Sequence, residues 1–409
     1  MWREGTFREA TTLLRSPLAA FAALARSGDT DLRISVLGRT LHVVTTPAVA
    51  RDVLSVQHDA YRKGPGLADA AFFLGDGLLT SAGPQWRQDH RRLRPLFDQA
   101  ALKAYHEVIE RETLRALRTA APRYHRDVAL LMHELTLTIA GRCFIGSDVS
   151  AEADRWRAAF AAASDSASRT MRRVVRLPRR VPSPTWWRER RAAGRLRPLV
   201  AALPAWDTGT GGGRSHPTTL LFAGSETTAA ALTWCCVHLM RDRALQERLA
   251  AAVADNGDAP TVESARRCAA LVQFVEEVLR MFPPVWAIPR TARHRHVIGG
   301  MQVEPGADVL VAVYAMHRSV GAWHEPLTFD STRFDAGGSH QRNDAYLPFG
   351  SGPRRCLGSE FALSEVTFVL AAMLARYRLE SAAELQPRER ATLTLSPLGA
   401  IPMRVSPRE

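Results

Sequence analysis

Apolar and polar positions follow a period of two near the start of this chain and a helical period over much of the rest. Residues 31–46 alternate across a Gly-Arg turn, which predicts a small hairpin of residues 32–36 with residues 41–45. Apolar residues then recur at helical spacing from about residue 47 to residue 203. The first half of the chain is therefore expected to be mainly helical, with one hairpin before the helices.

The second half combines long helical segments with a strand-rich segment. A glycine-rich stretch at about 204–217 predicts a linker or loop, and an alanine-rich helix is expected from about 218 to 240. Another helix is expected from 265 to 281, ending before Pro283 and Pro284. The remaining expected elements are strands within 288–313, a turn-rich loop at 346–352 and a helix from about 357 to 377.

These patterns indicate a mainly α fold with a small β region, formed by about residues 31–46 and 288–313. No internal repeat is visible, and the expected strands are too few for a doubly wound nucleotide-binding fold. A length of 409 residues suggests two or three domains, but a single helical domain spanning residues 1–409 around a buried cofactor also fits.

The composition excludes disorder as the main state, because 46% of the residues are hydrophobic and only 23% are charged. No apolar run reaches the roughly 18 to 20 residues that would cross a bilayer. Charged residues also occupy the amino-terminal stretch, where a secretory signal would need apolar ones. We therefore expect a soluble, cytoplasmic protein.

The charge is strongly basic and unevenly distributed. Lys and Arg number 54 against 41 Asp and Glu, a net charge of +13, and Lys63 and Lys103 are the only lysines. Residues 169–197 hold 11 arginines and one acid, Glu189, a local excess of +10. This run is interpreted as a solvated helix face or as a site for an acidic carrier protein, an anionic substrate or an anionic membrane. A basic nucleic-acid-binding protein is a distant alternative, because no helix-turn-helix, zinc-finger or RNP-like pattern accompanies the run.

The cysteines do not form a metal-binding pattern. There is no CxxC pair, so a structural zinc site is not expected. Four of the five cysteines are interpreted as small buried residues: Cys143, Cys235, Cys236 and Cys268. Cys356 differs from them because of its neighbours.

Cys356 lies in a glycine-rich loop just before a predicted helix. The positive end of that helix dipole favours a thiolate, and inward-pointing amide groups in the loop could hydrogen-bond the sulfur and tune its donation to a metal. Arg354 offers a fork for a carboxylate, and Gly358 removes a side chain where a flat ligand would pass close to the helix. The residues that recur at fixed intervals here are Phe349, Gly350, Gly352, Arg354, Cys356 and Gly358.

This loop resembles the FGxGxRxCxG haem-binding signature of the cytochrome P450 family. The resemblance implies the P450 fold, a triangular helical prism with haem between a long distal helix and the helix after the cysteine loop. It also implies haem b with Cys356 as the axial thiolate, a ligand that promotes O–O cleavage. Three further segments agree with it.

The first of these segments is EEVLR, in which Glu277 and Arg280 lie three residues apart on one helix face. Alone, this spacing indicates only a surface ion pair worth about 0–1 kcal/mol. In the family such a pair joins a downstream arginine, and here FDSTRF offers Arg333, although Ser331 and Thr332 replace the usual Pro and Glu. The resemblance implies a buried triad that supports the haem loop.

The second segment, LLFAGSETTAAAL, resembles the distal helix of the family. Gly224 in mid-helix costs roughly 1 kcal/mol relative to Ala, and in the family the missing side chain opens a groove for dioxygen. Glu226 and Thr227 supply an acid and an adjacent hydroxyl, which together can relay protons. The resemblance therefore assigns catalysis to Gly224, Glu226 and Thr227.

The third segment, WRQDHRRLRPLF, places Trp86 and His90 on one face of a helix, where their donors could hold haem propionates. Arg290, in AIPRTA, resembles another propionate ligand. Residues 69–79 are expected to form part of the roof of the site. By the same correspondence, the residues that face the substrate are Leu220, Ala223, Val285, Trp286 and Ile288, which are also explained as ordinary core residues.

The resemblance implies a haem-thiolate monooxygenase that inserts one oxygen atom into an apolar organic substrate, in bacterial specialised metabolism. Desaturation, cyclisation or aryl coupling without net hydroxylation is the alternative within the family. No flavin or iron–sulfur segment is visible, so electrons are expected from NAD(P)H through a separate ferredoxin and ferredoxin reductase. Basic residues flank the thiolate side and would attract an acidic ferredoxin: Arg91, Arg92, Arg94 and Arg355.

Overall fold

Two apolar helices lie against each other at the centre of a computed structural model of the protein: α7 (Val128–Ala140) and α10 (Ser215–Arg241). Asp127 caps α7, because its carboxylate accepts a hydrogen bond from the Ala129 amide at 3.0 Å. The structure describes residues 2–28, 30–119, 126–172, 184–204, 215–257, 259–335, 344–381 and 384–408. The glycine-rich stretch predicted at 204–217 falls largely outside these residues, and α10 begins three residues before the predicted start at residue 218.

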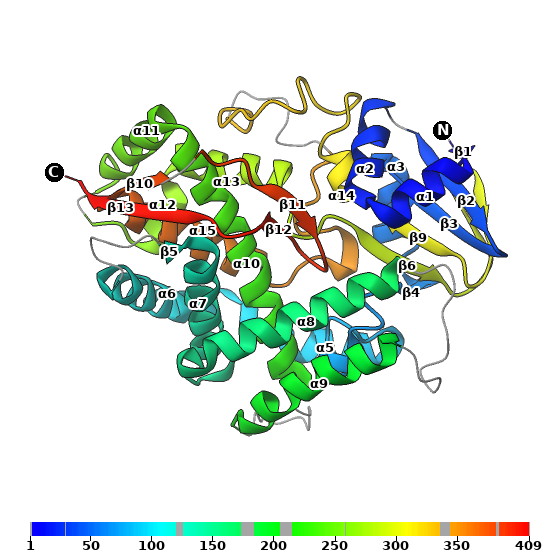
Figure 1. The fold of residues 1–409 in the computed structure, drawn as a ribbon, viewed down its shortest axis with the longest axis horizontal. Coiled ribbons are helices and arrows are strands. Elements are labelled where there is room, and N and C mark those ends of the chain that lie inside the picture. Colours follow the sequence, from blue (N-terminus) through cyan, green and yellow to red (C-terminus); the bar gives the residue numbers. More distant parts are fainter. Residues whose placement is uncertain are drawn as a thin grey trace.

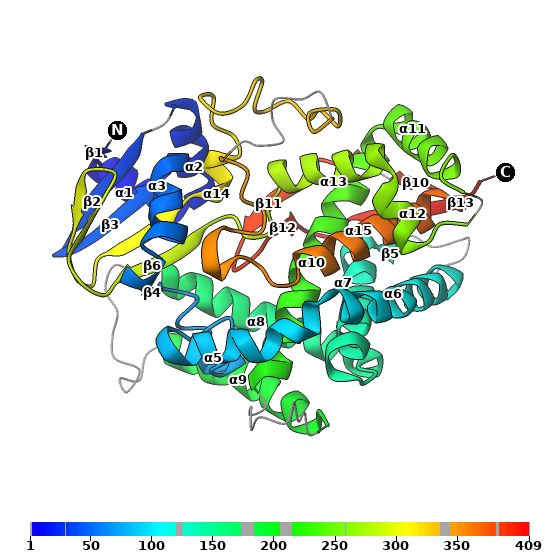
Figure 2. The same ribbon diagram turned by 180° about the vertical axis from the view of Figure 1, so that it is seen from behind.

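The other helices surround this pair, and Figures 1 and 2 show them from opposite sides. The helices that precede α7 in the sequence are α1 (Phe7–Arg15), α2 (Pro17–Arg26), α3 (Pro47–Arg51), α4 (Ala71–Leu74), α5 (Gly83–Leu93) and α6 (Gln99–Thr119). Between α7 and α10 in the sequence are α8 (Ala153–Met171) and α9 (Pro184–Ala202). After α10 come α11 (Arg243–Ala254), α12 (Val262–Arg267), α13 (Ala269–Met281), α14 (Val313–Met316) and α15 (Ser359–Leu374). Short 3-10 and π segments join several of them, including η1 (Asp52–Val56) and η4 (Gly141–Ile145).

The β structure gathers mainly at one end of the molecule, on the right in Figure 1. A six-stranded mixed sheet has the order β1-β2-β3-β9-β6-β4. Its strands are β1 (Trp2–Glu4), β2 (Asp31–Val36), β3 (Arg39–Val44), β4 (Tyr61–Lys63), β6 (Ile288–Ala292) and β9 (Asp308–Val311). The smaller sheets pair β7 (His296–Ile298) with β8 (Met301–Val303), β11 (Arg388–Ala391) with β12 (Leu395–Leu398), and β13 (Pro402–Pro407) with both β10 (Tyr377–Ser381) and β5 (Arg126–Asp127).

The predicted amino-terminal hairpin is confirmed, although its turn lies one position earlier than predicted. β2 and β3 are antiparallel, with Leu32 opposite Val43. Leu37 and Gly38 both have positive φ, 49° and 75°, so they form the turn, and Arg39 already belongs to β3. Two positive φ angles give the twist that a two-residue hairpin requires.

Two helix predictions in the second half need correction. The helix expected over 265–281 is two helices, because Cys268 has an extended backbone (φ −71°, ψ 93°) that separates α12 from α13. The helix expected over 357–377 ends at Leu374, since Tyr377 pairs with β13 as the first residue of β10. The fold class, mainly α with a small β region, is as predicted.

Two helical stretches are long and apolar enough to cross a membrane by composition alone, Val128–Ile145 and His216–Arg241. The sequence-based expectation that no such stretch exists is therefore corrected. However, 72% and 78% of these windows are buried inside the protein. The apolar character of α7 and α10 is explained by their burial against each other in the core.

Candidate active site

The loop before α15 is held in a tight turn by its own backbone. The Cys356 amide donates to the Phe349 carbonyl at 3.0 Å. Gly350 and Gly352 have φ angles of +70° and +69°, which side-chain-bearing residues rarely adopt. A Cβ at Gly352 would also lie 2.2 Å from the carbonyl oxygen of Leu54 in η1. The two glycines are therefore required by the backbone conformation.

Cys356 is the cysteine that solvent reaches, whereas Cys235, Cys236 and Cys268 are buried and Cys143 is partly buried. Enough protein surrounds Cys356 that desolvation raises the pKa of its thiol, and the Gly358 amide and the charge of Arg355 oppose this shift. Burial therefore opposes the stabilisation of the thiolate that was predicted from the helix end. A bound metal cation would supply the missing stabilisation, because metal coordination deprotonates a thiol.

The middle of α10 is partly exposed although the helix is otherwise mostly buried. Ala223 and Thr227 lie one turn apart on this exposed stretch, together with Gly224 and Glu226. Thr227 donates its hydroxyl hydrogen to the Ala223 carbonyl at 2.7 Å, which leaves its oxygen lone pairs free to accept a hydrogen bond. This exposed stretch is suited to line a ligand site.

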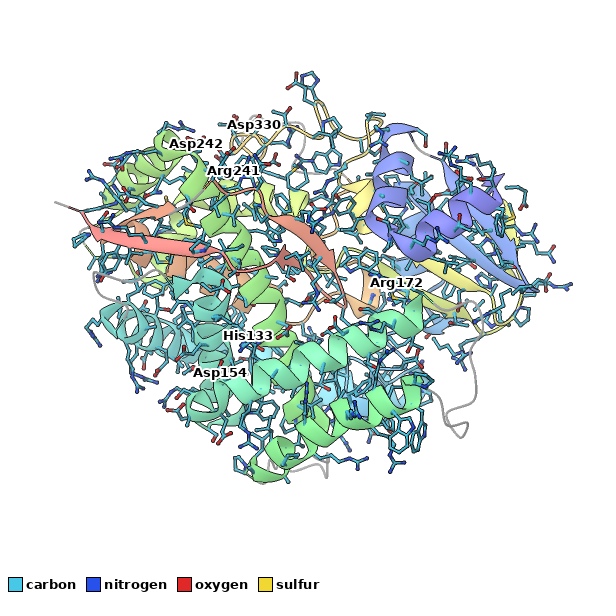
Figure 3. All side chains as sticks on the ribbon, in the orientation of Figure 1. His133, Asp154, Arg172, Arg241, Asp242 and Asp330 are labelled. Atoms are coloured by element: carbon cyan, nitrogen blue, oxygen red, sulfur yellow. The ribbon has the colours of Figure 1, made fainter. Side chains whose placement is uncertain are left out.

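Glu226 is bound from a neighbouring helix by a residue that the sequence did not single out. Nε2 of His133, on α7, lies 2.5 Å from Oε1 of Glu226, and Figure 3 labels His133 beside α10. The two side chains are only 9% and 13% exposed. No sequence motif signals this pair, because its members lie 93 positions apart.

Gly224 and Gly358 both lie close to aromatic side chains. A Cβ at Gly224 would lie 2.9 Å from the Phe144 ring and 3.4 Å from Cβ of Ala140, so this glycine allows α10 to approach α7 and η4. A Cβ at Gly358 would lie 3.2 Å from the Phe97 ring. In each case a side chain at this position would meet an aromatic ring, so both glycines are also required for packing.

Three cationic side chains lie between β4, β6 and the cysteine loop: Lys63, Arg290 and Arg354. None forms an ion pair with an acid among the described residues, although the charge of Asp59 acts on Arg354: burial lowers the pKa of Arg354, and Asp59 opposes this shift. Lys63 pairs with Arg290 across the strands β4 and β6. Desolvation and the neighbouring charge of Arg354 lower the pKa of Arg290 to about 9, and burial with both arginines lowers the pKa of Lys63 well below its usual value. Nε and Nη1 of Arg354 are buried without a partner among the described residues, and its guanidinium lies 4.9 Å from the centre of the Trp86 ring.

These observations allow a test of whether the residues fit a haem. Unpaired buried donors are rare in folded proteins and indicate a missing partner. Carboxylates are suitable partners for such cations, and haem carries two propionates. The ring of His90 packs against that of Trp86, with the centroids 5.1 Å apart and the planes tilted by 42°, and burial together with the charge of Arg94 lowers the pKa of His90. The donor set therefore fits, and Lys63 joins it as a residue that the sequence reading missed.

Glu277, Arg280 and Arg333 meet in the structure. Arg280 donates to the two carboxylate oxygens of Glu277 at 2.7 and 2.8 Å, and Nε of Arg333 donates to Oε1 at 3.2 Å. Glu277 and Arg280 are fully buried and Arg333 is 6% exposed. The replacement of the usual Pro and Glu by Ser331 and Thr332 therefore leaves this contact intact.

His317 links this triad to the cysteine loop. Its Nδ1 lies 3.1 Å from the Arg280 carbonyl, and its Nε2 accepts the Leu347 amide at 2.8 Å. These partners require a neutral ring with its hydrogen on Nδ1, and burial accordingly lowers the pKa of His317 to about 3. Leu347 precedes Phe349 by two residues, so the triad and the loop share one hydrogen-bonded network.

The residues expected to face the substrate do not all share one environment. Leu220 and Ile288 are buried at 6% and 9% exposure, whereas Val285 is 37% exposed and Ala223 is partly exposed. Trp286 differs from the expectation: its indole donates to the Thr392 carbonyl at 2.8 Å and packs against Phe21, with only 2% exposure. Its side chain is therefore part of the amino-terminal core. Within residues 69–79, Phe73 and Leu74 of α4 are also buried core residues.

Comparison with known proteins agrees with this geometry. The family model described as Cytochrome P450 matches residues 12–195 and 215–402. "Cyclooctatin synthase" of Streptomyces melanosporofaciens is 30% identical, covering 96% of this chain and 92% of that protein. "Cyclooctat-9-en-7-ol 5-monooxygenase" of the same organism is 27% identical, covering 92% and 90%. "Cytochrome P450 734A5" of rice is 34% identical over 46% of this chain and 36% of its own length.

Proposed function

The chain belongs to the cytochrome P450 family, and we propose that it is a haem-thiolate monooxygenase that inserts one atom of O2 into an apolar organic substrate. The observation that carries this proposal is a group of three cations beside an accessible Cys356. Lys63, Arg290 and Arg354 form no ion pair with an acid among the described residues, and two guanidinium nitrogens of Arg354 are buried without a partner there. A cofactor with two carboxylates and a metal that takes a thiolate satisfies both features.

Each group of residues would have a separate task. Cys356 would bind the iron, while Lys63, Arg290 and Arg354 would hold the propionates with Trp86 and His90. When bound, the haem-thiolate group supplies the activation of O2. The Thr227 hydroxyl donates its hydrogen to the Ala223 carbonyl, so its oxygen is free to accept a hydrogen bond from a proton donor. When the bond to Ala223 breaks, the same hydroxyl can donate its hydrogen to another acceptor. The apolar side chains of Leu220, Ala223, Val285 and Ile288 would exclude water and contact the substrate.

The substrate class is proposed from the relatives and from the apolar character of these positions. One full-length relative is named for the oxygenation of cyclooctat-9-en-7-ol, and another for the synthesis of cyclooctatin. We therefore favour a largely hydrocarbon substrate of bacterial specialised metabolism. A screen for ligand-induced shifts of the Soret band, across terpenoid, polyketide and peptide compounds, would identify the substrate.

The proposal is tested most directly by the absorbance of the reduced protein under carbon monoxide. A haem with an axial thiolate gives a red-shifted Soret band, whereas a haem with a histidine or no protein ligand does not. We expect the red-shifted band in the purified protein. Its absence from protein that contains haem would overturn the assignment of Cys356.

Replacing Thr227 by Ala tests the proton relay. We expect the Thr227→Ala enzyme to consume oxygen but to reduce most of it to hydrogen peroxide. The ratio of product to peroxide should therefore fall by about tenfold or more. The ratio is measured from product, peroxide and NAD(P)H consumed. Thr228→Ala, which changes the adjacent buried hydroxyl, is the matched control. An unchanged ratio in Thr227→Ala would show that the hydroxyl has no part in proton transfer.

Electrons are proposed to arrive from a ferredoxin and its reductase. Arg91, Arg94 and Arg355 are exposed, and their guanidinium groups form no ion pair with other described residues. They lie on α5 with its 3-10 extension and on the cysteine loop. A ferredoxin with an acidic surface would be attracted to this side, with a rate of association that falls as salt increases.

The arginine run is proposed to attract an anionic group near the substrate. Residues 173–183 of the run lie outside the described residues, but α9 presents Arg188, Arg191 and Arg195 as exposed side chains, while Arg190 stacks on Trp186 at 4.6 Å. Arg188, Arg191 and Arg195 are spaced by three and four residues, so they lie on one face of the helix.

We expect the triple change of Arg188, Arg191 and Arg195 to Gln to raise KM at low salt while kcat is retained, because charge steering acts on association. The same kinetics at physiological salt should show a smaller difference, since screening then acts over about 8–10 Å. Changing three exposed arginines elsewhere, Arg8, Arg241 and Arg248, controls for net charge. If both triple variants have the same KM at every salt concentration, the run is only a solvated face.

A further inference from the structure

The contact between His133 and Glu226 has a feature that a simple surface ion pair lacks. Nε2 of His133 lies 2.5 Å from Oε1 of Glu226, and both side chains are largely buried between α7 and α10. Nδ1 of the same ring is buried and has no partner among the described residues. A buried ring nitrogen without a partner is uncommon, and water is the usual partner for such a group.

Glu226 and Thr227 are held in different directions. Thr227 is bonded to the Ala223 carbonyl on its own helix, and Glu226 is bonded to His133 on the neighbouring helix. No hydrogen bond joins the Glu226 carboxylate to the Thr227 hydroxyl in the part of the chain that the structure describes. Among the described residues, the side-chain partner of the Glu226 carboxylate therefore lies on α7.

We propose that His133 is the positioning residue that orients Glu226 and passes protons to it from water. The ring would give its Nε2 proton to the Glu226 carboxylate as Nδ1 accepts a proton from a water molecule, and that water would regain a proton from bulk solvent. The charge of the ring is then the same before and after, and only its tautomer changes. This inference rests on the proposed function, because it assigns His133 a role in the same proton relay.

The test compares variants at His133 with a control at the same helix interface. His133→Gln keeps a hydrogen-bond donor but cannot exchange protons, and His133→Leu removes both properties. Thr136→Val is the control, since Thr136 donates to the Ser225 carbonyl at 3.1 Å, between the same two helices and one turn from His133. Each variant is combined with a surrogate ferredoxin and reductase and a ligand that shifts the Soret band.

We expect the ratio of product to peroxide to fall by about tenfold in both His133 variants and to stay at the parent value in Thr136→Val. Adding His133→Leu to Glu226→Gln should cause no further fall, because His133 acts through Glu226. Equal losses in His133→Leu and Thr136→Val, or additive losses in the double variant, would overturn the inference. If Glu226→Gln itself leaves the ratio unchanged, the proposed role of Glu226 fails instead.

A second measurement does not depend on turnover. The protein contains 13 histidines, so nitrogen-15 labelling of histidine gives a tractable spectrum, and His133→Gln identifies the His133 signal. In the diamagnetic carbon-monoxide complex we expect this signal to report an Nε2 hydrogen in a strong hydrogen bond, and to shift in Glu226→Gln. A His133 signal that is insensitive to Glu226→Gln would contradict the contact on which the inference depends.

Discussion

Replacing Cys356 by Ser should abolish both monooxygenase activity and the red-shifted Soret band of the reduced, carbon-monoxide-treated protein. The substitution removes the one sulfur that the loop presents to solvent, and a serine oxygen is a far weaker donor to iron. The turn itself should survive, because it is closed by the Cys356 amide and by Gly350 and Gly352, which the substitution does not change.

The measurement is the absorbance spectrum of the variant together with its haem content. We expect haem to be retained in part, since the cationic side chains that would hold its propionates remain in place. Cys143→Ala is the control, because Cys143 is a partly buried cysteine on η4. A Cys356→Ser protein with the parent spectrum would rule out Cys356 as the ligand.

The thiol also illustrates how far the sequence alone can be taken. The spacing of glycines around Cys356 predicted a tight turn, and the positive φ angles of Gly350 and Gly352 explain why those glycines are needed. The sequence did not reveal the opposing effect of burial, which raises the pKa of the thiol although α15 begins three residues later at Ser359. Local sequence determines the turn, whereas the ionisation of the sulfur depends on all the protein around it.

Contacts between distant segments could not be predicted for the same reason. His133 and Glu226 come from helices 93 positions apart, and Lys63 pairs with Arg290 across a sheet whose strand order the periodicity does not reveal. A single histidine on an apolar helix is usually an ordinary core residue. The structure is needed to assign a role to these residues, because the role depends on which groups lie next to each side chain.

The two glycines at Gly224 and Gly358 show a different limit. Both were assigned to ligand binding, yet their nearest neighbours are Phe144 and Phe97, whose rings pack against each other at 5.4 Å. Gly224 on α10 and Gly358 at the start of α15 therefore both lie against the aromatic cluster that contains Phe144 and Phe97. The structure therefore gives both glycines a role in helix packing that the motif alone does not reveal, and their role toward a ligand stays a prediction.

Replacing Glu277 by Ala should prevent most of the chain from folding into haem-containing protein. Glu277 accepts hydrogen bonds from Arg280, from Arg333 and from the Asp330 amide, and all of its side chain is buried. Without it, two buried guanidinium groups are left with carbonyl partners only, including the carbonyls of His317 and Thr328. Leaving a buried charge without its counter-ion costs about 3–5 kcal/mol.

That cost is a large part of the about 5–15 kcal/mol by which folded domains are usually stable. It would also act on the active site, because Arg280 holds His317 and His317 holds the Leu347 amide just before the cysteine loop. We therefore expect the yield of protein with the red-shifted carbon-monoxide band to fall further than the yield of soluble chain. The denaturation midpoint in urea should fall in the same variant.

Glu276→Ala is the matched control for this experiment. Glu276 is the neighbouring residue on α13 and has the same side chain, but no ion pair binds it among the described residues. Burial raises the pKa of Glu276, so its charged form contributes little that could be lost. Glu277→Gln separates charge from shape, because the amide keeps one acceptor oxygen while the negative charge disappears. If Glu277→Ala and Glu277→Gln both incorporate haem as well as Glu276→Ala does, then the triad does not support the cysteine loop, and the hydrogen bonds of the two arginines to backbone carbonyls are sufficient.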